Sequence, residues 1–250
     1  DHYHSLDDDI MTEQESIVVT IDAVRVCEER IHIGVRDKEL DLTLLLDEDE
    51  LAPLFAGAAW AGTLVWDAAV VLANHLLNDV RLESLRVLEL GAGIGVPGMV
   101  ASILGAKHVV ITEQPELVPL LRTNIRRNFP NGGVTATALS WGVAATNAFC
   151  DSFGAFDVVL SCDCIYQPLY GESWRALAVT MDVLCKRNPA CVVLVSVERR
   201  HEDGIDAFLA YLPEATSLHA TLYRTIPKIK KSLGDEGVGL ELYRITLIQQ

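Results

Sequence analysis

Residues 86–98 read RVLELGAGIGVPG, and this stretch decides the fold. Arg86–Leu90 is a short apolar run that predicts a buried strand, and Val96–Leu104 has the apolar content of a helix. The glycines between them allow a sharp turn and a close approach of the backbone to a ligand, because a Cβ atom would collide there. The N–H groups at the start of the helix favour negative charge nearby. The stretch therefore predicts a strand, a ligand-binding turn and a helix.

The central region continues this alternation of strands and helices. Runs rich in Val, Ile and Leu predict strands at His108–Thr112, Val134–Leu139, Phe156–Ser161 and Cys191–Val197. Helices are predicted at Trp66–Leu77, Glu116–Asn128, Trp174–Lys186 and Asp203–Leu212. Near-continuous apolar strands separated by helices are typical of a parallel sheet that is covered on both faces.

The C-terminal region breaks this rhythm. Leu218–Ile226 and Leu240–Ile248 are strand-like, and the segment KIKKSLGDEGVG that joins them contains no predicted helix. We expect an antiparallel hairpin that closes the sheet. The predicted fold class is thus α/β, Rossmann-like and doubly wound, with a mostly parallel seven-stranded sheet and a C-terminal antiparallel hairpin.

The N-terminal region has a different pattern. Residues 1–15 are polar and acidic and are expected to form a flexible tail. Ile17–Val26 and Arg30–Val35 alternate in polarity and predict a small β-hairpin. Leu40–Leu46 is apolar and ends in the acidic residues 47–50, which we expect to be solvated. Without a linker or an internal repeat, we expect residues 16–250 to form one domain, with a β extension at about 16–60.

Composition limits the partners and the compartment. The formal net charge is −15, and such an acidic chain repels nucleic-acid phosphates. No apolar run reaches the ~18 residues needed to span a bilayer, and no signal peptide is visible. The spacing of the six cysteines fits no zinc site, so we expect no metal and free thiols in a reducing compartment. We therefore expect a monomer in the cytoplasm or nucleus, without nucleic-acid or membrane partners.

The residues around the glycine turn point to an adenosine-containing cofactor. Glu113 follows the next strand and is placed to accept hydrogen bonds from both ribose hydroxyls. Gly93-x-Gly95-x-x-Gly98 matches a dinucleotide fingerprint, but Gly91 already opens the turn two residues earlier. Glu89, at the strand end, would repel a pyrophosphate and attract a cationic amino acid. These features favour S-adenosylmethionine, which carries an ammonium, a sulfonium and no phosphate. A nicotinamide-dependent oxidoreductase remains an alternative.

Several motifs resemble those of a known family. They are GTLVWDAAVVLANHL at 62–76, VLELGAGIGVPGMVASILGA at 87–106, VVITE at 109–113, LSWG at 139–142 and VVLSCDCIY at 158–166. In this order they resemble the seven-strand (class I) S-adenosylmethionine-dependent protein-lysine methyltransferases with an Asp-x-x-Tyr motif. The resemblance runs from about Gly62 to Arg199.

The resemblance implies a cofactor site and a product, S-adenosylhomocysteine. The implied cofactor-binding residues are Trp66, Glu89, Gly91, Ala92, Gly93, Glu113, Trp141 and Cys162. Trp66 would line the pocket, the glycine turn would lie under the methionine part, and Trp141 would lie beside the adenine. Glu113 stands where much of the family has Asp. Cys162 stands where the family often has Ala, and Ser161 where Gly is common.

The resemblance also implies a lysine of a protein substrate as the methyl acceptor. Asp163 and Tyr166 match the Asp-x-x-Tyr motif and are the predicted catalytic residues. A lysine amine must be neutral to attack, so a carboxylate that holds it by hydrogen bonding helps, whereas a purely ionic contact raises its pKa. Asp163 is therefore assigned a positioning role, and Tyr166 a wall of the channel.

Other readings stay open at this stage. The acceptor could be a small molecule or a different side chain, since the cofactor site does not reveal it. The chain could also be a scaffold that keeps the fold without catalysis. The Glu-Arg pair that begins at Glu198 either borders the substrate cleft or forms an internal ion pair with its neighbours Arg199 and Arg200.

Overall fold

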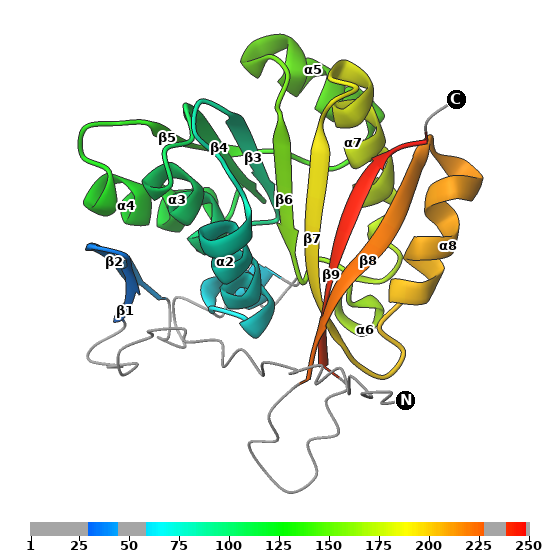
Figure 1. The fold of residues 1–250 in the computed structure, drawn as a ribbon, viewed down its shortest axis with the longest axis horizontal. Helices are drawn as coiled ribbons and strands as arrows, with labels where there is room; N and C mark the ends of the chain where they lie inside the picture. The colour runs from blue at the N-terminus through cyan, green and yellow to red at the C-terminus, as the bar shows by residue number, and fades with distance from the viewer. Residues whose placement is uncertain (1–29, 45–58, 228–238, 249–250) are drawn as a thin grey trace, which may run out of the picture.

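A seven-stranded sheet forms the centre of the computed structural model, which describes residues 30–44, 59–227 and 239–248. Its strands are β3 (Arg86–Leu90), β4 (His108–Glu113), β5 (Val134–Ala138), β6 (Val158–Cys162), β7 (Val192–Arg199), β8 (Leu218–Ile226) and β9 (Gly239–Leu247). Their order is β5-β4-β3-β6-β7-β9-β8, and β9 pairs antiparallel with both of its neighbours. The predicted fold class is confirmed (Figure 1).

Helices cover the sheet on both faces (Figure 1). The helices are α2 (Asp67–Asp79), α3 (Val96–Ile103), α4 (Val118–Asn128), α5 (Val143–Phe153), α6 (Gln167–Tyr170), α7 (Trp174–Arg187) and α8 (Ile205–Ala215), with a 3-10 turn, η2, at Ala59–Thr63. The prediction did not include α5 or α6. Helix α5 buries only Thr146, Phe149 and Cys150, so its apolar stripe is too narrow to be read from sequence.

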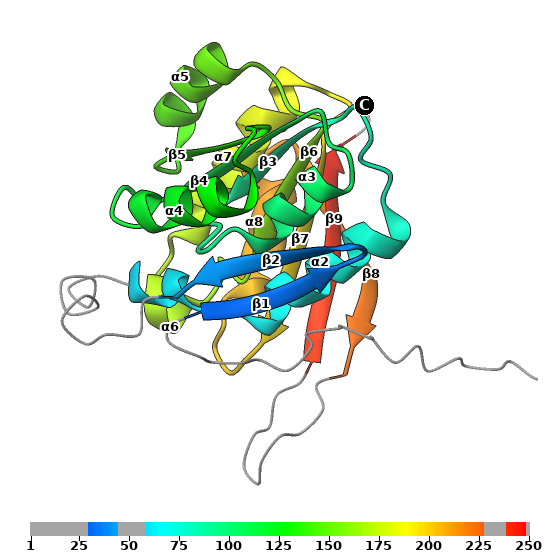
Figure 2. The same ribbon diagram turned by 90° about the vertical axis from the view of Figure 1, so that its left-hand side faces the viewer.

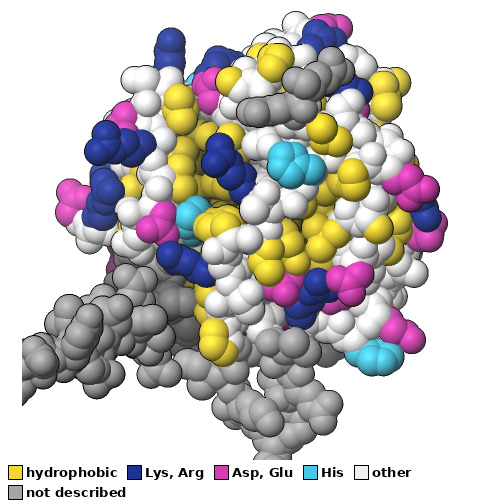
Figure 3. Space-filling view, turned by 45° about the vertical axis from the view of Figure 1, so that its right-hand side comes forward, with side chains coloured by type: hydrophobic (Ala, Val, Ile, Leu, Met, Phe, Trp, Pro, Cys, Tyr) yellow, Lys and Arg dark blue, Asp and Glu magenta, His cyan; other side chains and the backbone are white. Residues whose placement is uncertain are grey.

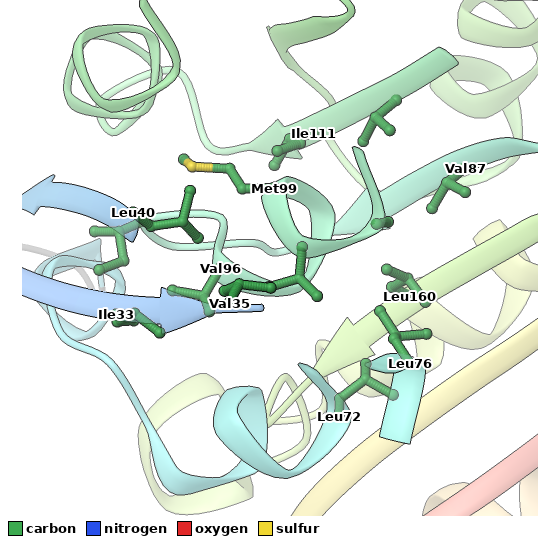
Figure 4. Packing of buried hydrophobic residues seen from close by; sticks show 14 of the residues in the cluster. Ile33, Val35, Leu40, Leu72, Leu76, Val87, Val96, Met99, Ile111 and Leu160 are labelled. Carbon is green, nitrogen blue, oxygen red and sulfur yellow. The ribbon is translucent and has the colours of Figure 1, made fainter. Parts of the chain in front are cut away.

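Alternate residues of the central strands enter two separate cores. Val158 and Leu160 of β6 join the core under α2 and α3, while Val159 joins the core under α5, α7 and α8. Leu72 and Leu76 of α2 pack onto the first of these cores (Figure 4). Because both faces of each central strand are buried, the strands read as continuous apolar runs.

The path of the chain through the sheet creates the site. From β3 the chain moves outward through β4 to β5, and then returns to place β6 on the other side of β3. In open α/β sheets, ligands bind at the carboxyl ends of the strands where this reversal occurs. Here that point lies between the ends of β3 and β6.

A small N-terminal hairpin is present as predicted, and its described pairing uses a second strand that the sequence did not predict. β1 (Arg30–Val35) pairs with β2 (Lys38–Thr43), and Arg36 in the connecting turn has φ +58°. The predicted partner, Ile17–Val26, lies outside the described residues. The observed pairing places the apolar residues of both strands on one face, from which Ile33, Val35 and Leu40 extend the first core (Figure 4).

The hairpin lies beside α4 (Figure 2), and two asparagines of this helix fasten it to the rest of the fold. Asn124 accepts a hydrogen bond from the N–H of Thr43 at 2.8 Å and donates to its carbonyl at 3.1 Å. Asn128, one helical turn later, makes the same pair of bonds to Asp41 at 2.8 and 2.9 Å. The two amides thus replace a neighbouring strand at the edge of β2.

The edge strand β8 lies at the end of the seven-stranded sheet that is opposite to β5. Its residues Leu222 and Tyr223 are 46% and 39% exposed, and the pairing with β9 is irregular between Leu222 and Arg224. Hydrophobic side chains on this side of the molecule lie among Lys, Arg, Asp and Glu (Figure 3). Bulges and charges are devices that discourage edge-to-edge association.

We expect Asn124→Ala to lower the free energy of unfolding by about 2–3 kcal/mol, because the buried Asn124 amide is removed and the half-buried N–H and C=O of Thr43 lose their partner. Urea denaturation measures the loss, and amide exchange at Thr43 locates it. Asn78→Ala, an exposed asparagine on α2, is the control and should change the stability by less than about 0.5 kcal/mol. Equal losses of stability in both variants would contradict the proposed role of Asn124 in holding the hairpin.

Candidate active site

A cavity of about 720 Å³ opens at the carboxyl ends of the central strands. The predicted residues that line it are Trp66, Gly91, Ala92, Gly93, Glu113, Trp141, Cys162 and Asp163. These residues come from the start of α2, from the turn after β3, and from the ends of β4, β5 and β6. Glu89 and Tyr166 do not line the cavity.

Close contacts explain the glycines of the turn. Gly91 has φ +59°, and a Cβ atom there would lie 2.6 Å from the Sγ of Cys164 and 3.1 Å from the Trp141 ring. Gly93 has φ +56°, and its Cβ would lie 2.9 Å from the carbonyl oxygen of Gly62. Both positions therefore need glycine for the backbone conformation and for the space.

We expect Gly93→Ala to abolish ligand binding in this cavity and to destabilise the fold. Gly132→Ala is a matched control, because Gly132 has φ +85° but nothing within 4 Å of its would-be Cβ. Both variants bear the left-handed strain of about 1–2 kcal/mol, and only Gly93→Ala adds a collision. Thermal melting and calorimetric titration with S-adenosylhomocysteine separate the two effects, and equal behaviour would contradict the steric account.

Glu113 ends β4 with its carboxylate at the cavity. Its Oε1 accepts a hydrogen bond from the N–H of Gly93 at 3.2 Å, and its Oε2 accepts one from Gln114. The side chain is 8% exposed, and this burial raises its pKa although the backbone hydrogen bonds oppose the shift. A carboxylate offers about four acceptor positions, so two remain for a ligand.

Glu89 lies beneath the turn instead of on the cavity surface. It is 1% exposed, and its Oε2 accepts a hydrogen bond from the N–H of Gly98 in α3 at 2.8 Å. A Cβ on Gly98 would lie 2.6 Å from that oxygen, so the glycine permits the contact. Burial raises the pKa of Glu89 to about 8. The residue predicted to face the ligand instead supports the turn from below.

The raised pKa of Glu89 makes stability depend on pH. The unfolded side chain ionises near pH 4.5 and the folded one near pH 8, so the folded state binds the extra proton between these values. The contribution of this protonated carboxyl to the free energy of unfolding is complete below pH 4.5 and is lost as the pH rises through 8. The loss is at most about 1.4 kcal/mol per pH unit.

We expect Glu89→Gln to remove this part of the pH dependence, because an amide does not ionise. In urea denaturation at pH 5, 7 and 9, the free energy of unfolding of the variant should increase relative to that of the wild type as the pH rises. Glu83→Gln, at an exposed position, should follow the wild type at every pH. Parallel curves for wild type and Glu89→Gln would rule out a neutral buried carboxyl.

Asp163 lies directly after β6, between the cavity and β7. Its backbone is in the left-handed region with φ +51°, its N–H donates to the carbonyl of Ser196 at 2.8 Å, and its Oδ1 accepts from the N–H of Glu198 at 3.1 Å. Its carboxylate is also paired with Arg200 at 2.6 Å. Tyr166 packs against the same guanidinium, 5.1 Å from its ring centroid, and so contacts Asp163's partner and not the cavity.

Further residues that line the cavity were not predicted, and four of them shape the glycine turn and the cavity wall. Gly62 meets the glycine turn, Leu117 lies over Gly62, Cys164 contacts Gly91, and Tyr170 of α6 closes one side. Gly62 and Cys164 lie inside the quoted motifs, so they could have been predicted from sequence. Leu117 and Tyr170 could not, because their place in the cavity depends on how separate segments fold together.

The charges that line the cavity are all negative. They are Glu113, Glu116 and Asp163, and no Lys, Arg or His is among the described lining residues. A pyrophosphate would find no cation here, whereas an ammonium and a sulfonium would find carboxylates. In the described part of the chain, no group of His, Cys, Asp and Glu could hold a metal, and no helix is long and apolar enough for a bilayer.

Comparison with known sequences decides the family. Residues 46–214, more than half of the chain, match the sequence model of a family described as lysine methyltransferase. The chain belongs to the lysine methyltransferase family. The resemblance expected from the motifs is thereby confirmed.

Three relatives illustrate the spread of similarity to this methyltransferase. Protein N-lysine methyltransferase METTL21A of Danio rerio is 36% identical over 164 residues, which cover 64% of this chain and 71% of the relative. Protein-lysine methyltransferase METTL21E of Bos taurus is 34% identical over 183 residues, covering 68% and 62%. A protein of Plasmopara viticola named secreted RxLR effector protein 48 is 48% identical over 164 residues, covering 61% and 80%.

Solved structures share the fold of the methyltransferase. A putative RNA methyltransferase from Pyrococcus horikoshii aligns with a TM-score of 0.50 at 20% identity, covering 73% of this chain and 84% of that one. A putative methyltransferase complexed with SAH aligns at 0.59 with 10% identity, covering 88% and 56%. At these identities the likeness concerns the fold alone.

Proposed function

We propose that this chain binds S-adenosylmethionine in the 720 Å³ cavity and transfers its methyl group to a lysine of another protein. The observation that carries the proposal is the combination of a glycine cradle with a lining that holds three carboxylates and, among its described residues, no cation. Family membership supports the lysine acceptor.

The lining residues fit the cofactor. Gly91 and Gly93 form a tightly packed turn that borders the cavity, where the methionine part would lie, and the free acceptor positions of Glu113 suit the ribose hydroxyls. Trp141, beside Gly91, would flank the adenine, and the backbone at Cys162 borders the same space. When bound, the cofactor supplies a methyl group that its sulfonium has already activated.

The protein's remaining task is to align the acceptor and to exclude water. Having a lysine amine neutral at pH 7 costs about 4–5 kcal/mol, given its reference pKa of ~10.4. An apolar surrounding reduces this cost, because burial disfavours the ammonium form. Trp66, Leu169 and the ring of Tyr170 provide such a surrounding next to Asp163. The carboxylate of Asp163 can orient the lone pair of the amine through a hydrogen bond.

The test is tritium transfer from S-[methyl-³H]adenosylmethionine to the proteins of a cell lysate, followed by hydrolysis and identification of methylated lysine. Glu113→Gln should weaken S-adenosylhomocysteine binding by about tenfold or more and lower the transfer, because hydrogen bonds to a charged acceptor are lost. Glu214→Gln, an exposed acid on α8, is the control and should match the wild type.

Each alternative has its own outcome in this test. Label found only in small molecules would favour a different acceptor. Absence of S-adenosylhomocysteine binding would favour a scaffold, and binding of a dinucleotide would favour an oxidoreductase. The monomeric state, the cytoplasmic or nuclear location, the absence of nucleic-acid and membrane partners, and the single domain over 16–250 stay predictions.

A further inference from the structure

Arg200 pairs with the carboxylate of Asp163, the residue predicted to orient the acceptor. Its guanidinium donates to both oxygens of Asp163, at 3.0 Å to Oδ1 and 2.6 Å to Oδ2, and to Oε2 of Glu198 at 2.5 Å. The side chain is 21% exposed. Burial opposes its charge, but the hydrogen bonds and charges of these two acids hold the pKa of Arg200 above its usual range.

Two aromatic rings hold the guanidinium in place. The centroid of the Trp66 ring lies 5.6 Å from its central carbon, and that of the Tyr166 ring lies 5.1 Å away. The backbone N–H of Arg200 donates to Oδ2 of Asp203 at 3.0 Å. Trp66 and Asp163 also line the cavity, so Arg200 stands directly behind two of its wall residues.

The hydrogen bonds leave Asp163 with little free capacity. Its carboxylate accepts one bond from the N–H of Glu198 and two from Arg200. Since a carboxylate has about four acceptor positions, about one remains for an acceptor amine. The guanidinium of Arg200 is the cation that the described contacts place on both Asp163 and Glu198.

We propose that Arg200 is a positioning residue of the acceptor site, whose guanidinium neutralises Asp163 so that this carboxylate accepts a hydrogen bond from a neutral lysine amine instead of pairing with an ammonium ion. The proposal rests on the function proposed above. An arginine suits this role because it stays charged throughout the physiological pH range and its fork grips both carboxylate oxygens.

The consequence for the acceptor follows from charge alone. An amine beside an unpaired carboxylate gains a proton more easily, and an amine that also faces a fixed cation loses it more easily. Arg200 thus retains the orienting hydrogen bond while removing most of the ionic attraction. The site then selects the form of lysine that can attack a methyl group.

The other titratable groups around Asp163 do not mask this effect. Burial raises the pKa of Cys164 to about 12, and it also raises those of Cys162 and Tyr170, so these three stay neutral at moderate pH. Tyr166, Glu198 and Asp203 are present in every variant compared below, as are Glu113 and Glu89. A difference between wild type and an Arg200 variant therefore reports on the guanidinium.

The first experiment needs no turnover. n-Butylamine, a mimic of the lysine side chain, is titrated at pH 7 into the protein saturated with S-adenosylhomocysteine and, separately, into the protein alone. Arg200→Gln should bind the ammonium ion about tenfold more tightly than wild type, because Asp163 then lacks the guanidinium that pairs with it. The double variant Asp163→Asn/Arg200→Gln should lose the gain.

Arg199→Gln is the matched control. Arg199 is the neighbouring residue and pairs with Glu241 at 2.6 Å and Asp206 at 2.7 Å, away from Asp163. It should leave n-butylamine affinity unchanged. Equal affinity for n-butylamine in wild type and Arg200→Gln would overturn the proposal, whatever the enzyme does with proteins.

The second experiment follows methyl transfer to the lysate protein that wild type labels most strongly. Arg200→Gln should shift the alkaline rise of kcat by about one pH unit upward and lower kcat at pH 7 about tenfold, while KM stays equal or falls. Arg200→Lys keeps the positive charge and should keep the wild-type pH profile of kcat. If Arg200→Gln melts early, Arg200→Lys is the variant that tests the proposal. An unshifted profile in a folded Arg200→Gln protein would overturn the proposal, whereas no labelling by wild type would count against the proposed function.

Discussion

The close contact between the backbones of Gly62 and Gly93 is the constraint on which the site depends. A Cβ on either glycine would collide, at 2.9 Å from the Gly62 oxygen or at 2.4 Å from Leu117. Because neither has one, the segment before α2 lies directly on the turn after β3. This places Trp66 beside the cavity and lets Glu113 reach the N–H of Gly93. One steric condition thus joins three segments that are distant in sequence.

Three buried acids at this edge of the sheet have different roles because their partners differ. The carboxyl group of Glu89 accepts one described hydrogen bond, from the N–H of Gly98, and burial drives it toward its neutral form. Glu113 keeps acceptor positions open to the cavity. Asp163 is paired with an arginine behind the wall. Chemically similar groups therefore lie in three different environments: beneath the turn, at the cavity surface, and against an arginine behind the wall.

The sequence predicted most of the fold because the central strands are buried on both faces, which makes them continuous apolar runs bounded by glycines and helices. It did not predict α5, whose buried stripe is narrow, or the pairing of β1 with β2, whose register depends on the turn at Arg36. Most of the predicted cofactor-binding residues lay in local motifs and could be named from sequence. The burial of Glu89 could not be predicted, because a side chain at the end of a strand can face either the cavity or the adjoining helix.

The partner of Asp163 was equally hidden in the sequence. Arg199 and Arg200 are adjacent and identical, and only their alternate directions at the end of β7 send one to Glu241 and the other to Asp163. The sequence left open whether this stretch forms an internal pair or borders the cleft. In the structure Arg200 forms internal ion pairs with Glu198 and Asp163, and of these three residues Asp163 lines the cavity.

The asparagine clamp on α4 gives the hairpin a mechanical connection to the cavity. Helix α4 has 11 residues, a rod of roughly 16 Å. Its far end holds β2 through Asn124 and Asn128, and Leu117, the residue before its first turn, covers Gly62. The hairpin and the glycine turn are therefore held in place by residues of one helix and of the turn that precedes it.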